Sequence, residues 1–104
     1  MAGYFFLDVR EITDQAKLDE YRSRVLATVE RYGGRYLLVG GKCEVVEGGW
    51  QPVFPVLITF PTLEHAHRWY SSDEYKDLKA MRLSATRGNG VFMESEVNEF
   101  VRNA

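Results

Sequence analysis

The sequence has 104 residues, 45% of them hydrophobic and 27% charged, with a formal net charge of -2. These values predict a single globular domain over residues 1-104, and the apolar runs are too short to cross a membrane. Because Lys and Arg are interspersed with Asp and Glu, the chain lacks the basic stripe typical of nucleic-acid binding. The lone cysteine, Cys43, and a first segment without a secretion signal lead us to expect a cytoplasmic protein.

The first part of the chain predicts a strand followed by a helix. Residues Tyr4 to Val9 are apolar at odd and even positions except at Asp8, which is typical of a strand buried on both faces. From Asp14 to Tyr32, apolar residues recur every three or four positions and predict an amphipathic helix. Thr13 or Asp14 can cap its first turn, and Gly33-Gly34 supplies the residue type that ends helices.

The middle of the chain predicts a hairpin. Arg35 to Val39 forms a second predicted strand, which we expect to bend at Gly40-Gly41 and to continue from Lys42 to Glu47. Gly48-Gly49 is then expected to reverse the chain. The regular part of the third strand is expected over Val56 to Phe60, because the two prolines before it disrupt pairing.

The last part of the chain predicts a broken helix and a final strand. Pro61-Thr62 introduces the first half, and the capping-box spacing of Ser71 and Glu74 predicts a second half from Asp73 to about Ala85. Its core-facing residues are predicted to be Tyr75, Leu78, Met81 and Leu83. The segment Arg87-Gly88-Asn89-Gly90 then predicts a turn into a strand from Val91 to about Val97.

The order β-α-β-β-α-β predicts an α+β fold of the ferredoxin-like kind, in which a four-stranded antiparallel sheet carries its helices on one face. The opposite face should then be exposed to water. The strands are nevertheless apolar at both parities, so this face needs a cover. A second copy of the chain can supply it, and we therefore expect a homodimer whose sheets pair as a dimeric α/β barrel.

The whole chain resembles the domain of unknown function 1330 family, within the dimeric α/β-barrel superfamily of ferredoxin-like proteins. The residues that carry the resemblance are Tyr32-Gly33-Gly34-Arg35-Tyr36-Leu37, Gly40-Gly41, Glu44 through Glu47-Gly48, Trp50, Phe60-Pro61, Trp69-Tyr70, Ser72, Tyr75 and Arg82. The resemblance implies a homodimer with facing sheets but no established activity. Relatives in the superfamily include cofactor-free monooxygenases, muconolactone isomerases and haem-dependent enzymes, so the architecture supports several chemistries.

Arg35 is the first candidate site residue. It opens the second predicted strand, where its guanidinium can bind a carboxylate or phenolate ligand. The alternative is a structural ion pair with Asp8 or Glu44. Asp8 has a matching pair of interpretations, because a carboxylate in an apolar strand can act as a general base unless a cation neutralises it.

Aromatic residues around the predicted helix break are the other candidates. Trp69, Tyr70 and Tyr75 either pack in the core or line a flat pocket between helix and sheet, and Tyr21 and Tyr36 have the same two interpretations. His65 and His67 lie two apart on a helix and cannot chelate one metal unaided, so the sequence supports no metal site and no cofactor. Two hypotheses follow: a small-molecule binding protein or cofactor-independent enzyme that uses Arg35, Trp69, Tyr75 and Arg82, or a non-catalytic dimeric module.

Overall fold

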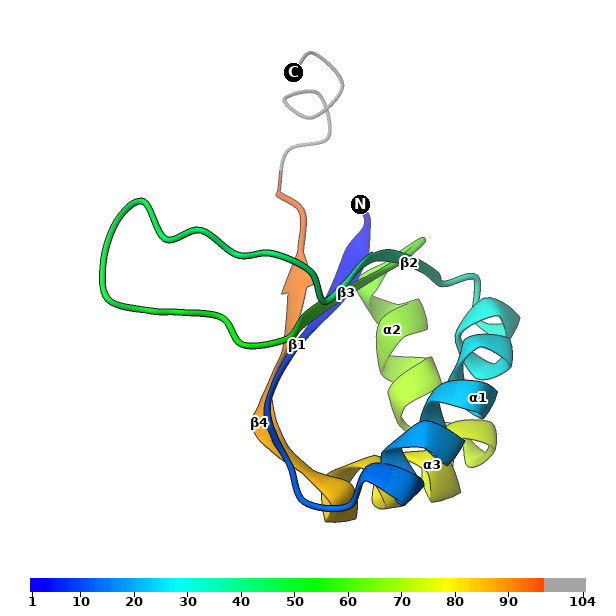
Figure 1. The fold of residues 1–104 in the computed structure, drawn as a ribbon. Helices are drawn as coiled ribbons and strands as arrows, with labels where there is room; N and C mark the ends of the chain where they lie inside the picture. Colours follow the sequence, from blue (N-terminus) through cyan, green and yellow to red (C-terminus); the bar gives the residue numbers. More distant parts are fainter. Residues whose placement is uncertain (97–104) are drawn as a thin grey trace.

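The computed structural model describes residues 1–96, which form a four-stranded antiparallel sheet with three helices on one face (Figure 1). The elements in chain order are β1 (Gly3–Ile12), α1 (Gln15–Arg31), β2 (Arg35–Val39), β3 (Pro55–Phe60), α2 (Leu63–Tyr70), α3 (Asp73–Ala85) and β4 (Thr86–Glu94). The spatial order β2-β3-β1-β4 confirms the predicted ferredoxin-like fold. In the part of the chain described, no helix has the length and apolarity that crossing a membrane requires.

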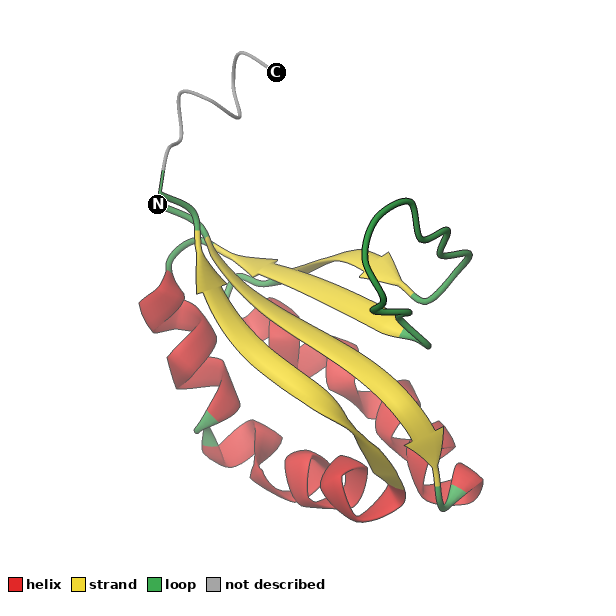
Figure 2. Cartoon of the chain, turned by 90° about the vertical axis from the view of Figure 1, so that its left-hand side faces the viewer, coloured by secondary structure: helices red, strands yellow, loops and turns green. Residues whose placement is uncertain are grey.

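The strand register assigns each side chain to one face of the sheet. Phe5 of β1 lies opposite Ile58 of β3 and Phe92 of β4, and these residues face the helices. Because side chains alternate along a strand, Phe6 and its partners face the other way. Figure 2 looks onto that helix-free face, with the helices behind the sheet.

Helix α1 begins and ends where the sequence predicts. The Asp14 side chain accepts a hydrogen bond from the Lys17 backbone N–H at 3.1 Å, which caps the first turn. At the other end Gly33 has a φ of +77°, a conformation that other residues rarely adopt, and the Gly34 N–H donates to the Val29 carbonyl. The capping and the glycine stop together position β2 beside β3.

The break between α2 and α3 is confirmed, but its cap is Ser72 and not Ser71. The Ser72 hydroxyl donates to the Trp69 carbonyl at 2.7 Å and accepts from the Tyr75 N–H at 3.2 Å. One buried hydroxyl therefore ties the end of α2 to the start of α3. It also fixes the rings of Trp69 and Tyr75, whose centroids lie 4.2 Å apart.

Two predictions about the strands are wrong. Residues 40–54 form a long connection without a strand from Lys42 to Glu47, and this connection extends beyond the helix-free face (Figures 1 and 2). The glycines of Arg87-Gly88-Asn89-Gly90 lie within β4 and make no turn. A Cβ at Gly88 would overlap the Asp8 carbonyl oxygen, so this glycine allows β4 to approach β1.

Replacing Gly88 by Ala is expected to destabilise the fold, because the new methyl group meets β1 backbone that cannot move aside cheaply. We expect a loss of about 1–3 kcal/mol in the free energy of unfolding, the usual cost of overpacking. Urea denaturation measures it. Gly49→Ala is the matched control, since no atom lies within 4 Å of the added methyl group. Equal stability of the two variants would contradict the close β1–β4 approach.

Candidate functional site

Two adjoining open pockets of about 410 and 450 Å³ lie between the sheet and the helices. Both volumes lie in the range of small-molecule binding sites. Phe5, Leu7, Val9 and Arg82 line both pockets, so the two spaces meet at these residues. We call the smaller one the α1 chamber and the larger one the β4 chamber.

The α1 chamber lies between β1, β2, β3 and helix α1. Its walls are almost entirely apolar or aromatic, and they include Leu18, Tyr21, Val25, Tyr36, Val56 and Ile58. Leu26 and Val39 are exposed and form part of its rim. At the same rim the guanidinium of Arg22 lies over the ring of Phe54, 5.1 Å from its centroid. This chamber is therefore suited to an apolar body.

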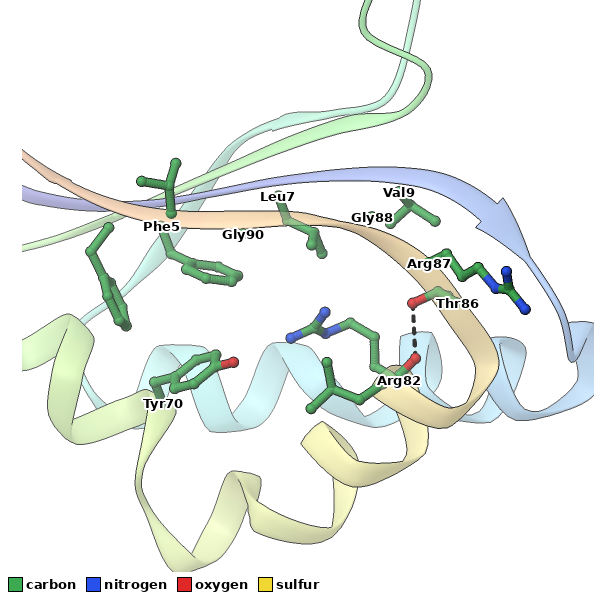
Figure 3. Close-up of a pocket in the computed structure, with 12 residues that line it drawn as sticks. Phe5, Leu7, Val9, Tyr70, Arg82, Thr86, Arg87, Gly88 and Gly90 are labelled. Atoms are coloured by element: carbon green, nitrogen blue, oxygen red, sulfur yellow. Dashed lines mark hydrogen bonds between the residues drawn. The ribbon is translucent and has the colours of Figure 1, made fainter.

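Two glycines of β4, Gly88 and Gly90, line the β4 chamber. Gly90 lies opposite Leu7 and Gly88 opposite Val9, on the same face as these two core residues. Across the open space lie Tyr70 and Arg82, as Figure 3 shows. A side chain at Gly90 would meet Phe5 and Leu7 in front of the strand, whereas one at Gly88 would meet the β1 backbone.

Arg82 carries a buried positive charge at the junction of the two chambers. Only 4% of this residue is exposed, and its guanidinium extends from α3 into the space between Tyr70 and the strands (Figure 3). Its Nε donates a hydrogen bond to the Tyr75 hydroxyl at 3.2 Å. Among residues 1–96 no carboxylate forms an ion pair with Arg82, and its only side-chain hydrogen bond is the one from Nε. No fully buried side-chain nitrogen in that part of the chain lacks a partner, so the two Nη atoms keep accessible surface. The two Nη groups therefore remain available to a bound molecule.

A pair of buried tyrosines supports this arginine. The hydroxyl oxygens of Tyr75 and Tyr21 lie 2.8 Å apart, so a chain of hydrogen bonds runs from Arg82 through Tyr75 to Tyr21. Burial, reinforced by the neighbouring Tyr75, raises the pKa of Tyr21 far above its ordinary value and raises the pKa of Tyr36 to about 12. Burial opposes the charge of Arg82, but Tyr75 and Tyr21 favour it, and the pKa of Arg82 is raised. At neutral pH the site thus combines protonated phenols with a cation.

The structure brings three of the four predicted site residues together. Trp69 and Tyr75 are fully buried and stack on each other, and the Trp69 Nε1 donates to Thr28 at 3.0 Å. They form the packed block behind Arg82, whose Nε bonds to Tyr75. Arg35 lies apart from them. It is exposed at the start of β2 and lines a separate surface pocket with Gly33 and Thr59. No residue of that pocket lines either chamber.

The predicted structural ion pairs of Arg35 are wrong. Asp8, which is 1% exposed, accepts hydrogen bonds from the Arg10 Nη1 at 2.8 Å and from two backbone N–H groups of residues 53 and 54. Glu44 pairs with Lys42 at 2.9 Å. Asp8 therefore holds the end of the 40–54 connection against β1, and its local partner Arg10 makes a distant one unnecessary.

The buried face of α3 also differs from the prediction. Tyr75, Leu78, Arg82 and Ala85 are buried, whereas Leu83 is 56% exposed. Spacings of three and four residues join these buried positions, so the helical period itself placed a charged residue in the core stripe. That signal was present in the sequence. The sequence analysis weighed Tyr21 and Tyr70 as core or pocket residues without assigning them to the site, and it did not consider the two β4 glycines as site residues.

Comparison with known proteins identifies the family. The family model described as "Domain of unknown function (DUF1330)" matches residues 2–95. The chain belongs to this family. Its description assigns no function, and no protein with a curated description is significantly similar to the chain. The residue pattern from Tyr32 to Arg82 thus led to the correct family.

Solved structures confirm the fold at low sequence identity. A protein of unknown function from Rhodopseudomonas palustris has a TM-score of 0.73 and 12% identity, over 92% of this chain and 83% of that one. A mutant of SnoaB, a cofactor-independent oxygenase from Streptomyces nogalater, has a TM-score of 0.66 and 10% identity over 93% and 95%. A dimeric ferredoxin-like protein of unknown function from Jannaschia has a TM-score of 0.59 and 13% identity over 93% and 100%.

A pair of Arg→Met substitutions should separate a binding arginine from a structural one. Arg82→Met replaces an uncompensated buried charge by an apolar chain, so the free energy of unfolding should stay unchanged or rise by about 1 kcal/mol. Arg10→Met removes the cation from the buried Asp8 carboxylate, which keeps only its two backbone donors, and should cost about 1–3 kcal/mol. Urea denaturation at one protein concentration measures both. A loss of several kcal/mol at Arg82 would show that this arginine is structural.

Proposed function

We propose that the protein binds a small organic molecule with one negatively charged group and an apolar, planar body, and that Arg82 recognises the charge. The observation that carries the proposal is the buried guanidinium without a carboxylate partner among residues 1–96. Burying a charge is costly unless a partner neutralises it. A bound anion supplies that partner, and the fork of guanidinium donors suits a carboxylate or phenolate.

The walls of the two chambers support an apolar body for this ligand. Phe5, Leu7 and Val9 form a shared apolar floor on β1, and Tyr70 and Phe92 add aromatic surface on the β4 side. No Asp, Glu or His lines either chamber in the part of the chain described. A general base of the ordinary kind is therefore absent from these walls, which favours binding over proton abstraction. Arg35 belongs to neither chamber, and we place it outside the proposed site.

We further propose that the protein is a cytoplasmic homodimer formed through the helix-free face. An apolar row crosses all four strands of this face and consists of Leu38, Leu57, Phe6 and Val91. Leu38 is 44% and Val91 49% exposed, so the row needs a cover. The dimeric description of the Jannaschia protein with this fold supports a second copy as that cover. The alternative function is that of a non-catalytic dimeric module, which only assembles. That alternative gives no role to the charge of Arg82, which has no carboxylate partner among residues 1–96.

The charge of the ligand should determine its affinity through Arg82. We expect wild-type protein to bind β-naphthoate at least about tenfold more tightly than the neutral β-naphthamide, the scale of one charged hydrogen bond. Isothermal titration calorimetry of both compounds measures the ratio. Arg82→Met should abolish the preference, while Arg35→Met, the same change at an exposed arginine, should keep it. Equal wild-type affinities for the acid and the amide would refute the anion site.

The dimer should depend on the apolar row of the sheet. Phe6→Glu places a charge in the centre of that row, where no cation lies opposite, and should yield monomer or aggregate. Ala27→Glu, an exposed position on α1, is the control and should leave a species of twice the chain mass. Sedimentation velocity at low micromolar concentration measures both. A wild-type protein that sediments only as monomer would contradict the assembly.

A further inference from the structure

We propose that the hydroxyl of Tyr21 is a second ligand donor of the site, aimed from the chamber wall at an acceptor oxygen of the molecule that Arg82 binds. The inference rests on the proposed function, because it needs a ligand in the chambers. It goes beyond that function by adding a requirement that charge alone does not impose. The bound group must present an oxygen on the α1 side of Arg82.

The argument begins with the hydroxyl protons of Tyr21 and Tyr75. Each phenol carries one proton to donate and lone pairs to accept. The Arg82 Nε is always a donor, so the Tyr75 oxygen accepts from it. The 2.8 Å contact between the two hydroxyls uses one of their two protons. Among residues 1–96 no other hydrogen bond involves either hydroxyl, so one O–H has no acceptor from the protein.

Burial decides which of the two protons is left over. Tyr75 has no exposed surface and lines neither chamber, so an unsatisfied O–H there would carry the full desolvation penalty. Tyr21 is 8% exposed and lines the α1 chamber. The lower-energy arrangement is therefore Arg82 donating to Tyr75 and Tyr75 donating to Tyr21. Because Tyr21 lines the α1 chamber, a molecule bound there can supply the acceptor that its proton lacks.

This order of donation, from Arg82 to Tyr75 to Tyr21, also makes the Tyr21 hydroxyl a stronger donor. Hydrogen bonds in series polarise one another, so a chain that starts at a guanidinium makes its last O–H a better donor. Burial raises the pKa of Tyr21, which keeps this hydroxyl protonated in neutral solution. Two consecutive hydrogen bonds, both made by the Tyr75 hydroxyl, connect the Tyr21 hydroxyl to the Arg82 Nε, so the two groups lie close together. One carboxylate has enough lone pairs for a guanidinium and a phenol.

The chemistry thus selects a ligand class more narrowly than charge does. Carboxylates, and neutral molecules with a carbonyl oxygen in the same place, satisfy Tyr21. A hydrocarbon of the same shape fills the chamber but leaves the phenol proton without an acceptor, at the cost of an unsatisfied buried group. Affinity should therefore depend on two separable terms, the ligand charge at Arg82 and the ligand oxygen at Tyr21.

Three probes of one shape separate these terms: β-naphthoate, β-naphthamide and β-methylnaphthalene. Tyr21→Phe should weaken binding of the acid and of the amide, each by about tenfold. Binding of the hydrocarbon should instead become tighter, because the variant has no phenol proton to leave without an acceptor. Tyr32→Phe is the matched control, because the Tyr32 hydroxyl donates to Glu74 outside the chambers, and it should change none of the three affinities. Calorimetric titration of each protein with each probe gives the full comparison.

Each outcome assigns success or failure to one proposal. If wild-type protein prefers the acid over the amide but Tyr21→Phe binds both as wild type does, the Tyr21 donor is refuted and the anion site stands. If Tyr21→Phe weakens all three probes equally, Tyr21 shapes the wall without donating, and the inference is again wrong. If wild-type protein does not distinguish the acid from the amide, the proposed function itself fails. The hydrocarbon titration also reports whether the variant retains a folded chamber.

Discussion

The hydrogen bond between the Arg82 Nε and the Tyr75 hydroxyl is the contact on which the proposed binding site depends. It holds a cation inside an apolar layer without neutralising it. The position of both residues follows from Ser72, whose hydroxyl caps α3 and so fixes its rotational phase. Tyr75 and Arg82 are seven residues apart, close to two helical turns, and therefore point toward the sheet from the same face.

The interior combines a rigid block with an open space, and the two are needed together. On one side Trp69 stacks against Tyr75 and lies 5.5 Å from the ring of Phe60, which leaves the support of Arg82 little freedom to move. On the other side Gly90 leaves β4 without a side chain next to Phe5 and Leu7, and the guanidinium adjoins the open β4 chamber. A packed support and an unfilled front are what a preorganised binding site requires.

The two faces of the sheet carry different tasks in our proposal. The helix-facing side holds the chambers, and the helix-free side holds the apolar row through which a second copy would bind. The buried Asp8 carboxylate fixes the end of the 40–54 connection through hydrogen bonds to its backbone. The same connection carries Trp50, whose ring lies 6.1 Å from that of Phe6 between centroids. The fold is shared with an oxygenase and with proteins of unknown function, so function must be argued from the site and not from the fold.

The sequence by itself determined the element order, the glycine stop of α1 and the break between α2 and α3, because caps and helical periods are local signals. It also brought Trp69, Tyr75 and Arg82 into one set of candidates. It did not distinguish Arg82 from Arg35, since the burial of a cation depends on helix phase and strand register, which are set by packing between distant segments. Only the tertiary structure decided that the β4 glycines serve close strand approach and an open chamber, because an Arg-Gly-Asn-Gly segment has the same local preference for a turn in either case.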